Sequence, residues 1–167
     1  MPVVEYRGMQ LIVPENDSEF LGYFEAARQH RLVLKKCSAC QLMRYPPGSG
    51  CPWCMSLDWT WQEVSGKGTI YTYEIIVHAI QPGFRAIAPY PVVVVELDEQ
   101  RGVPTTYDGL RLVANLVDKQ FNPEVEEQVG IGKRVEVVFQ QLSEEFTLPQ
   151  FALSNEPPEG PVWHFPS

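Results

Sequence analysis

All the cysteines of this 167-residue chain lie in one segment, KKCSACQLMRYPPGSGCPWC, which runs from Lys35 to Cys54. The cysteines form two C-x-x-C pairs separated by ten residues. Each pair offers two sulfurs from one tight turn, and two such turns complete a tetrahedron around a metal ion. The predicted ligands are Cys37, Cys40, Cys51 and Cys54.

Zinc in a structural role is the favoured metal, because four cysteine ligands leave no coordination position open for a substrate. Iron in a rubredoxin-like site is the alternative. A thioredoxin-like redox pair needs a βαβ context that this sequence lacks, and disulfides need an oxidising compartment that nothing in the sequence indicates. The segment is rich in Pro and Gly and too small to bury a core of its own, so we expect the metal to fold it.

The charge of the chain is distributed unevenly. Thirteen bases against 21 acids give a net charge of −8, which argues against a nucleic-acid partner because phosphates are neutralised by clustered Lys and Arg. Five of the bases and no acid lie between Ala26 and Leu57. The cysteine segment is therefore the basic part of an acidic protein, and solvated surface charges are the simplest explanation.

The rest of the chain divides into a short helical part and a long β part. Residues 1–15 are predicted to be extended, and a helix of about four turns should begin near Asn16, with Asp17 or Ser18 as its cap. From Trp59 onward, alternating apolar residues and turn residues predict strands with no helical pattern between them. This order predicts a mainly β protein that ends in a small closed antiparallel barrel.

The predicted domain organisation has four parts. They are an N-terminal extended segment and helix (1–36), a zinc ribbon (37–62), a barrel (63–153) and a tail rich in proline and aromatic residues (154–167). The chain has no stretch of about 18 uncharged apolar residues and no secretory signal at its start, so we expect a cytoplasmic protein without membrane contact.

The sequence lacks an assembled catalytic set. Its three histidines, His30, His78 and His164, are scattered, and no cysteine lies outside the two pairs to act as a nucleophile. His78 is the one histidine at a predicted strand end, beside a Pro-Gly-Phe-Arg loop. We therefore expect no independent enzymatic activity.

Several segments occur in an order that resembles one known family. They are FLGYFEAARQHRLVLKKC, CSAC and CPWC followed by Trp59 and Trp61, SGKGTIYTYEIIVH, the PGF loop, YPVVVVELDE, LRLVANLVD, IGKRVEVVF and TLPQFALS. Together they resemble the DUF35 family, whose members join a rubredoxin-like zinc ribbon to an OB-fold. The likeness covers roughly residues 18–153.

The resemblance implies a non-catalytic accessory subunit. It implies that the chain is a partner of a thiolase-superfamily enzyme (a thiolase, an acyltransferase or a thiolase-fold aldolase), whose acyl-CoA site it would help to form. The alternative is a free-standing module that binds single-stranded nucleic acid or another protein. A nucleic-acid face would place aromatic residues among Lys and Arg, whereas here Tyr71 and Tyr73 lie beside Glu74.

Within this picture two sets of contact residues are expected. Lys35, Lys36 and Arg44 would give the ribbon a positive surface that grips the acidic surface of a partner. Phe84 and Arg85 would lie over the partner's acyl-CoA channel, with Arg85 on a phosphate or carboxylate. The alternative for Phe84 is that it plugs the end of the barrel.

Overall fold

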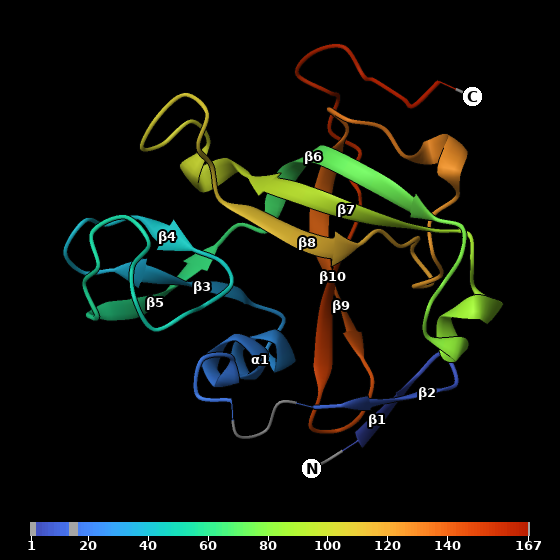
Figure 1. Cartoon of the computed structure of the whole chain (residues 1–167), viewed down its shortest axis with the longest axis horizontal. Coiled ribbons are helices and arrows are strands. Elements are labelled where there is room, and N and C mark those ends of the chain that lie inside the picture. The colour runs from blue at the N-terminus through green and yellow to red at the C-terminus, as the bar shows by residue number, and fades with distance from the viewer. Residues whose placement is uncertain (1–2, 14–16, 167) are drawn as a thin grey trace.

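The computed structural model of the chain describes residues 3–13 and 17–166. Figure 1 shows a barrel on one side, a ribbon with its helix on the other, and an N-terminal hairpin below them. In this part of the chain no helix is long and apolar enough to cross a membrane. The predicted mainly β fold is confirmed.

The barrel is a five-stranded antiparallel sheet with the strand order β10-β9-β6-β7-β8. Buried and half-buried residues alternate along β7, as expected for a strand with one face in the core. The sheet curls until β8 and β10 meet at a single parallel bridge between Leu116 and Phe151, which nearly closes the barrel and is consistent with an OB-fold. The strands are β6 (Lys67–Ile76), β7 (Tyr90–Leu97), β8 (Arg111–Asn115), β9 (Arg134–Gln141) and β10 (Thr147–Leu153).

The ribbon is a three-stranded sheet with the order β4-β3-β5, and the helix α1 packs beside it (Figure 1). Its elements are α1 (Leu21–Arg28), β3 (Leu32–Cys37), β4 (Met43–Arg44) and β5 (Trp59–Val64). A Cβ at Gly22 of α1 would lie only 2.3 Å from the indole nitrogen of Trp61, so a glycine is needed where the helix approaches β5. Because β3 begins at Leu32 and β5 ends at Val64, the sheet of the ribbon extends beyond the predicted bounds 37–62 on both sides.

The helix is shorter than predicted. Asn16 lies outside the described residues, and α1 contains only the eight residues Leu21–Arg28. The carbonyl of Asp17 accepts hydrogen bonds from the N–H groups of Phe20 and Leu21, and its Oδ1 accepts the N–H of Glu19 at 3.0 Å. The predicted cap residue therefore caps a separate turn before α1, and Phe20, at the start of the helix itself, makes no side-chain cap. His30 adopts a left-handed φ of 56°, which directs the chain out of the helix and into β3.

The N-terminal segment is paired rather than simply extended. β1 (Val3–Tyr6) and β2 (Met9–Ile12) form a hairpin whose turn residues, Arg7 and Gly8, both have positive φ. The hydroxyl of Tyr6 donates to Oε1 of Gln150 at 3.2 Å, and this bond ties the hairpin to β10.

One apolar cluster runs through the base of the ribbon and the barrel. Leu34 and Val64 of the ribbon belong to the same buried cluster as Ile70 and Val93 of the barrel. The tip of the ribbon differs, because Met55 and Leu57 there are 81% and 71% exposed. Burial therefore stabilises the base of the ribbon but not the tip that carries the second cysteine pair.

Candidate metal centre and its surroundings

Each cysteine pair lies in a turn of the same construction. In the first turn Gln41 donates its backbone N–H to the carbonyl of Cys37, and in the second Met55 donates to the carbonyl of Cys51. Gln41 and Met55 have left-handed φ values of 66° and 64°. The residue after each pair thus reverses the chain, so both sulfurs of a pair point to the same side.

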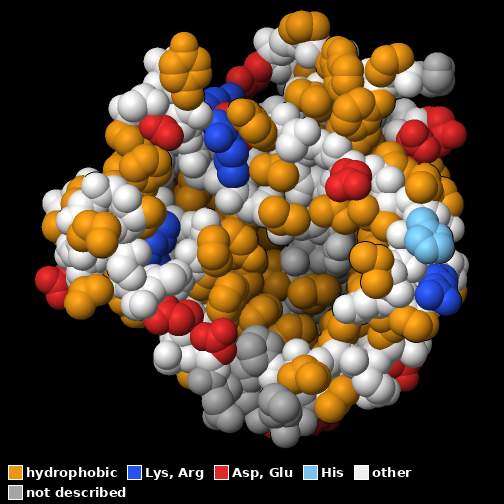
Figure 2. All heavy atoms as spheres, viewed as in Figure 1, with side chains coloured by type: hydrophobic (Ala, Val, Ile, Leu, Met, Phe, Trp, Pro, Cys, Tyr) orange, Lys and Arg blue, Asp and Glu red, His pale blue; other side chains and the backbone are white. Residues whose placement is uncertain are grey.

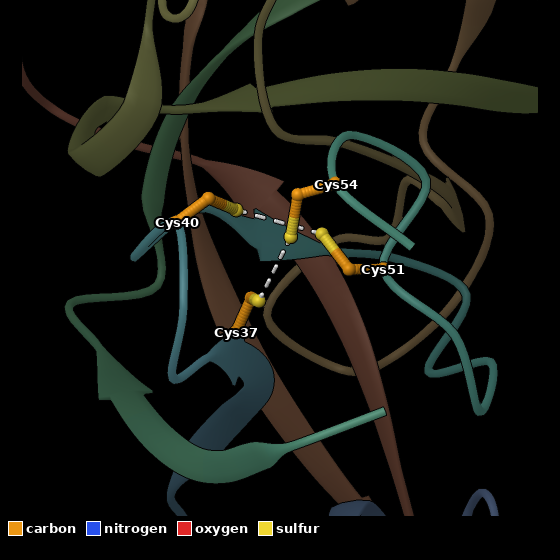
Figure 3. A group of neighbouring side chains, drawn as sticks. All are labelled: Cys37, Cys40, Cys51 and Cys54. Carbon is orange, nitrogen blue, oxygen red and sulfur yellow. Dashed lines mark hydrogen bonds between the residues drawn. The ribbon is translucent and has the colours of Figure 1, made fainter. Parts of the chain in front are cut away.

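The two turns bring the four sulfurs together. All four Sγ atoms lie within 4.8 Å of one another. The distances from Cys37 to Cys54 and from Cys40 to Cys51 are 3.6 and 3.5 Å, and Figure 3 shows the four side chains converging. A zinc ion with four bonds of about 2.3 Å would separate tetrahedral sulfurs by about 3.8 Å, so the arrangement suits one such ion.

The thiols differ in acidity because their surroundings differ. A hydrogen bond from the Cys40 backbone lowers the pKa of the Cys37 thiol to about 6. At Cys40 the backbone hydrogen bond from Leu42 lowers the pKa, but burial and the other three sulfurs outweigh it and raise the pKa to about 12. Four thiolates this close repel one another, and a divalent cation at their centre would remove that repulsion.

Lys35 occupies a place that the sequence analysis did not foresee. Its side chain is only 1% exposed, and its Nζ lies 2.5 Å from Oε2 of Glu19. The same nitrogen is 4.0 Å from the ring centre of Trp59 and 5.7 Å from that of Trp61. The lysine therefore joins the turn before α1 to the outer strand of the ribbon by an ion pair and cation–π contacts.

Arg44 is also turned inward. It is 5% exposed and donates to the carbonyls of Gly48 and Ser49, so it holds the loop that returns to the second cysteine pair. The expectation that Lys35 and Arg44 give the ribbon an exposed positive surface is therefore wrong, because both side chains are buried. Lys35 pairs with Glu19, whereas the Nη1 of Arg44 is buried without a hydrogen-bond partner among the described residues. Lys36, on the other face of β3, is half-buried and is the one of the three with access to solvent.

Gln100 was missed by the sequence analysis altogether. Its side-chain oxygen accepts the backbone N–H of Met43 at 2.7 Å, and its nitrogen donates to the carbonyl of the same residue at 2.9 Å. The amide thus pairs with β4 as another strand would, and it fixes the ribbon against the barrel. No sequence pattern signals this contact, because the two residues are 57 positions apart.

The loop that carries Phe84 and Arg85 lies at the end of the barrel remote from the ribbon, in the helical turn Pro82–Ala86. Phe84 is half-buried, with ring centres 5.6 Å from Tyr90 and 6.2 Å from Tyr6, as expected for a residue that plugs the barrel end. Arg85 is exposed. Two apolar residues of the same connection, Val77 and Ile80, are 75% and 89% exposed.

Comparison with known proteins identifies the family. A model of the ChsH2 rubredoxin-like zinc ribbon domain matches residues 24–60, and a model of the ChsH2 C-terminal OB-fold domain matches residues 61–140. A DUF35 domain-containing scaffold protein of Methanocaldococcus jannaschii is 32% identical over 115 residues, which cover 68% of this chain and 71% of that protein. The chain belongs to the DUF35 family of ChsH2-like proteins, as the resemblance predicted.

Two further relatives come from enzyme systems. A probable enoyl-CoA hydratase alpha subunit of Thermomonospora curvata is 40% identical over 129 residues, which cover 77% of this chain but only 35% of that protein. The chain thus spans about a third of this longer relative. The solved structure of an Ltp2-ChsH2(DUF35) aldolase contains a chain with 37% identity and a TM-score of 0.66, and the match covers 84% of this chain and 98% of that one.

Proposed function

We propose that this chain is a non-catalytic accessory subunit, which binds a thiolase-superfamily enzyme (a thiolase, an acyltransferase or a thiolase-fold aldolase) and helps to form its acyl-CoA site. The observation that carries the proposal is the match to almost the whole DUF35 chain in the structure of an aldolase. The names of the other relatives, a scaffold protein and a hydratase subunit, agree with a role in an assembly.

The surroundings of the histidines support a non-catalytic role. The ring of His30 stacks on Phe139 at 5.3 Å, and Nδ1 of His164 lies 2.7 Å from the carbonyl of Val129. His78 is exposed on the loop after β6. The three imidazoles thus lie in three separate environments and do not form one acid–base site.

In this proposal the ribbon is a rigid arm. Cys37, Cys40, Cys51 and Cys54 hold a structural zinc ion, and Lys35, Arg44 and Gln100 fix the arm from within. The contact with the partner's acyl-CoA channel is made by the loop after β6. Phe84 shapes this loop from behind, while Val77 and Ile80 offer apolar surface and Arg85 offers a charge for a phosphate or carboxylate.

Co-expression with a thiolase-fold enzyme from the same organism tests the assembly. We expect the two chains to elute together with the mass of a hetero-oligomer, and we expect the isolated chain to leave acyl-CoA thioesters unchanged. The double substitution Phe84→Ala with Arg85→Ala should leave the complex intact and lower its turnover about tenfold, the effect of one lost contact of about 1.4 kcal/mol.

Lys119→Ala removes another exposed charge, in the turn after β8, and serves as the matched control that should keep full turnover. Turnover by the isolated chain that is lost in His78→Ala would overturn the proposal. So would a chain that remains alone in the presence of every thiolase-fold enzyme of its organism.

A further inference from the structure

The barrel has an open seam between its two outermost strands. β8 and β10 are the edges of the sheet, and they meet where Val117 donates its N–H to the carbonyl of Phe151 at 2.8 Å. Before that point, among the described residues, β8 pairs only with β7 and β10 only with β9. Backbone groups along both strands therefore face the seam.

The registers show which groups these are. Leu97 donates its N–H to the carbonyl of Leu110, so in the register that follows, Leu112 and Ala114 exchange hydrogen bonds with β7. In an antiparallel ladder the intervening residues direct their N–H and C=O groups to the other side. On β8 these seam-facing residues are Arg111, Val113 and Asn115.

The same reasoning applies to β10, with a different result. Ser154 donates to the carbonyl of Arg134, and this register turns the backbone groups of Thr147, Pro149 and Phe151 toward the seam. Pro149 has no N–H, so the edge of β10 lacks a donor at its centre. Proline on an edge strand is a usual protection against strand pairing, and the edge of β8 has no such protection.

A neutral groove lies along this unprotected edge. Its volume is about 220 Å³, and none of the described residues that line it is charged. Figure 2 shows apolar side chains in a hollow between the ribbon, the barrel and the helix. Val113, at the centre of the edge, is 64% exposed. The aromatic residues of the groove are Tyr23 and Phe24 of α1, Tyr45 of the ribbon, and Phe151 of β10.

One end of the groove is acidic. Phe24 also lines an adjoining cavity of about 560 Å³, where the charged residues in the described part of the chain are Glu25, Glu144, Glu145 and one base, Arg28. A segment that leaves the groove past Phe24 enters a region with a net negative charge. A positively charged residue at that end of the segment would be stabilised there.

We propose that β8 binds an extended segment of a partner protein as an additional strand. The segment pairs with the backbone of Arg111, Val113 and Asn115, places apolar side chains in the aromatic groove, and continues with Lys or Arg into the acidic cavity. The identity of the partner as the enzyme subunit rests on the proposed function. The ability of the β8 edge to accept a strand is independent of the proposed function.

A peptide probe tests the proposal without any partner enzyme. The probe is acetyl-Val-Thr-Val-Ile-Lys-Lys-amide, added to the zinc-loaded full chain, and the measurement is amide hydrogen exchange by NMR. The N–H groups of Val113 and Asn115 should exchange at least about tenfold more slowly, while those of Leu112 and Ala114, already bonded to β7, should not change.

Two control peptides separate the contributions. Acetyl-Val-Thr-Pro-Ile-Lys-Lys-amide lacks a central donor, and acetyl-Val-Thr-Val-Ile-Glu-Glu-amide reverses the charge, so both should bind more weakly. Unchanged exchange at Val113 and Asn115 with millimolar probe would overturn the proposal. Protection that grows with protein concentration in the absence of peptide would also overturn it, because the occupant would then be a second copy of this chain.

Substitutions at one position test the edge itself. Val113→Pro removes a seam-facing N–H and none of the groups that bond to β7, whereas Val113→Thr keeps the N–H and the branched side chain. We expect the first variant to bind the probe at least about tenfold more weakly and the second to bind it within about twofold. If Val113→Pro does not fold, the two control peptides on the natural chain still decide the question.

The complex with the enzyme separates this proposal from the proposed function. A complex that forms normally with a folded Val113→Pro variant would place the docking surface elsewhere and leave the accessory role intact. If the peptide binds at β8 but no complex with an enzyme forms, the strand-binding edge is supported and the accessory role is overturned.

Discussion

The ribbon and the barrel are held together by different means. The barrel buries alternating aliphatic residues of five paired strands, such as Val93, Val95 and Leu97 of β7. The tip of the ribbon exposes its large apolar residues, Trp53, Met55 and Leu57, and instead brings four sulfurs within 4.8 Å of one another. A segment too short to exclude water from a core is rigid only if a few strong, directed interactions replace burial.

The largest expected effect is the loss of one cysteine ligand. Cys51→Ser should abolish tight zinc binding and unfold the tip of the ribbon, because zinc binding in such small modules supplies about 10–16 kcal/mol of folding free energy. Metal analysis should fall from one zinc per chain to none. Amides of the two cysteine turns should lose protection from exchange, while those of β7 keep it.

Ser38→Ala changes an exposed side chain beside Cys37 and should have neither effect. A metal-free preparation of the natural chain whose ribbon amides stay protected would remove the distinction between the two regions. In that case burial alone would hold the ribbon.

A smaller effect is expected at the base of the ribbon, where two adjacent lysines face opposite sides. Lys35→Ala removes a buried charge, its contacts with two tryptophans and its ion pair with Glu19. It should lower the free energy of unfolding by about 2–3 kcal/mol, somewhat less than for a fully buried pair because Glu19 is one-third exposed.

The matched control is Lys36→Ala, which should cost less than about 1 kcal/mol. Urea unfolding of the zinc-loaded proteins measures both values. Equal losses for the two variants would mean that Lys35 contributes only its apolar stem, which both lysines share.

The smallest effect belongs to the barrel and depends on pH. Arg134, which is 6% exposed, donates two hydrogen bonds to Asp98 and two to Glu156. The hydrogen bond from Arg134 lowers the pKa of Asp98 below its usual value. The ionised Asp98 carboxylate therefore contributes its full stabilisation above the pKa of about 4 that it has in the unfolded chain. This stabilisation is lost as pH falls through the lower pKa that Asp98 has in the folded protein.

Asp98→Asn should reduce stability at pH 7 by about 1–2 kcal/mol and should weaken the dependence of stability on pH between 2 and 4. Asp58→Asn is the control, since this exposed carboxylate makes no ion pair among the described residues. Thermal unfolding across this pH range measures the difference. An unchanged pH dependence in Asp98→Asn would assign the acid sensitivity to other carboxylates.

The parts of the fold that local chemistry specifies can be predicted from the residues alone. Two C-x-x-C pairs with a Pro- and Gly-rich return loop fixed the cysteine cluster, and alternating apolar residues fixed the strands of the barrel. These features can be predicted from the sequence because each depends on residues close together in the chain. The helix that the sequence predicts from Asn16 is longer than α1, which runs only from Leu21 to Arg28. A separate turn precedes it, and His30 directs the chain away from it in a left-handed conformation.

The charges and strand edges that a partner can reach depend on contacts between distant parts of the chain. Lys35 and Arg44 were predicted at the surface, yet Glu19, two tryptophans and the carbonyls of a return loop enclose them. Gln100 joins the barrel to the ribbon across 57 positions. β8 has an open edge because it is the last strand of the sheet and meets β10 only at the bridge between Leu116 and Phe151. The burial of a charge and the pairing of a strand edge depend on neighbours from distant parts of the chain. Neither can therefore be predicted from a local sequence pattern.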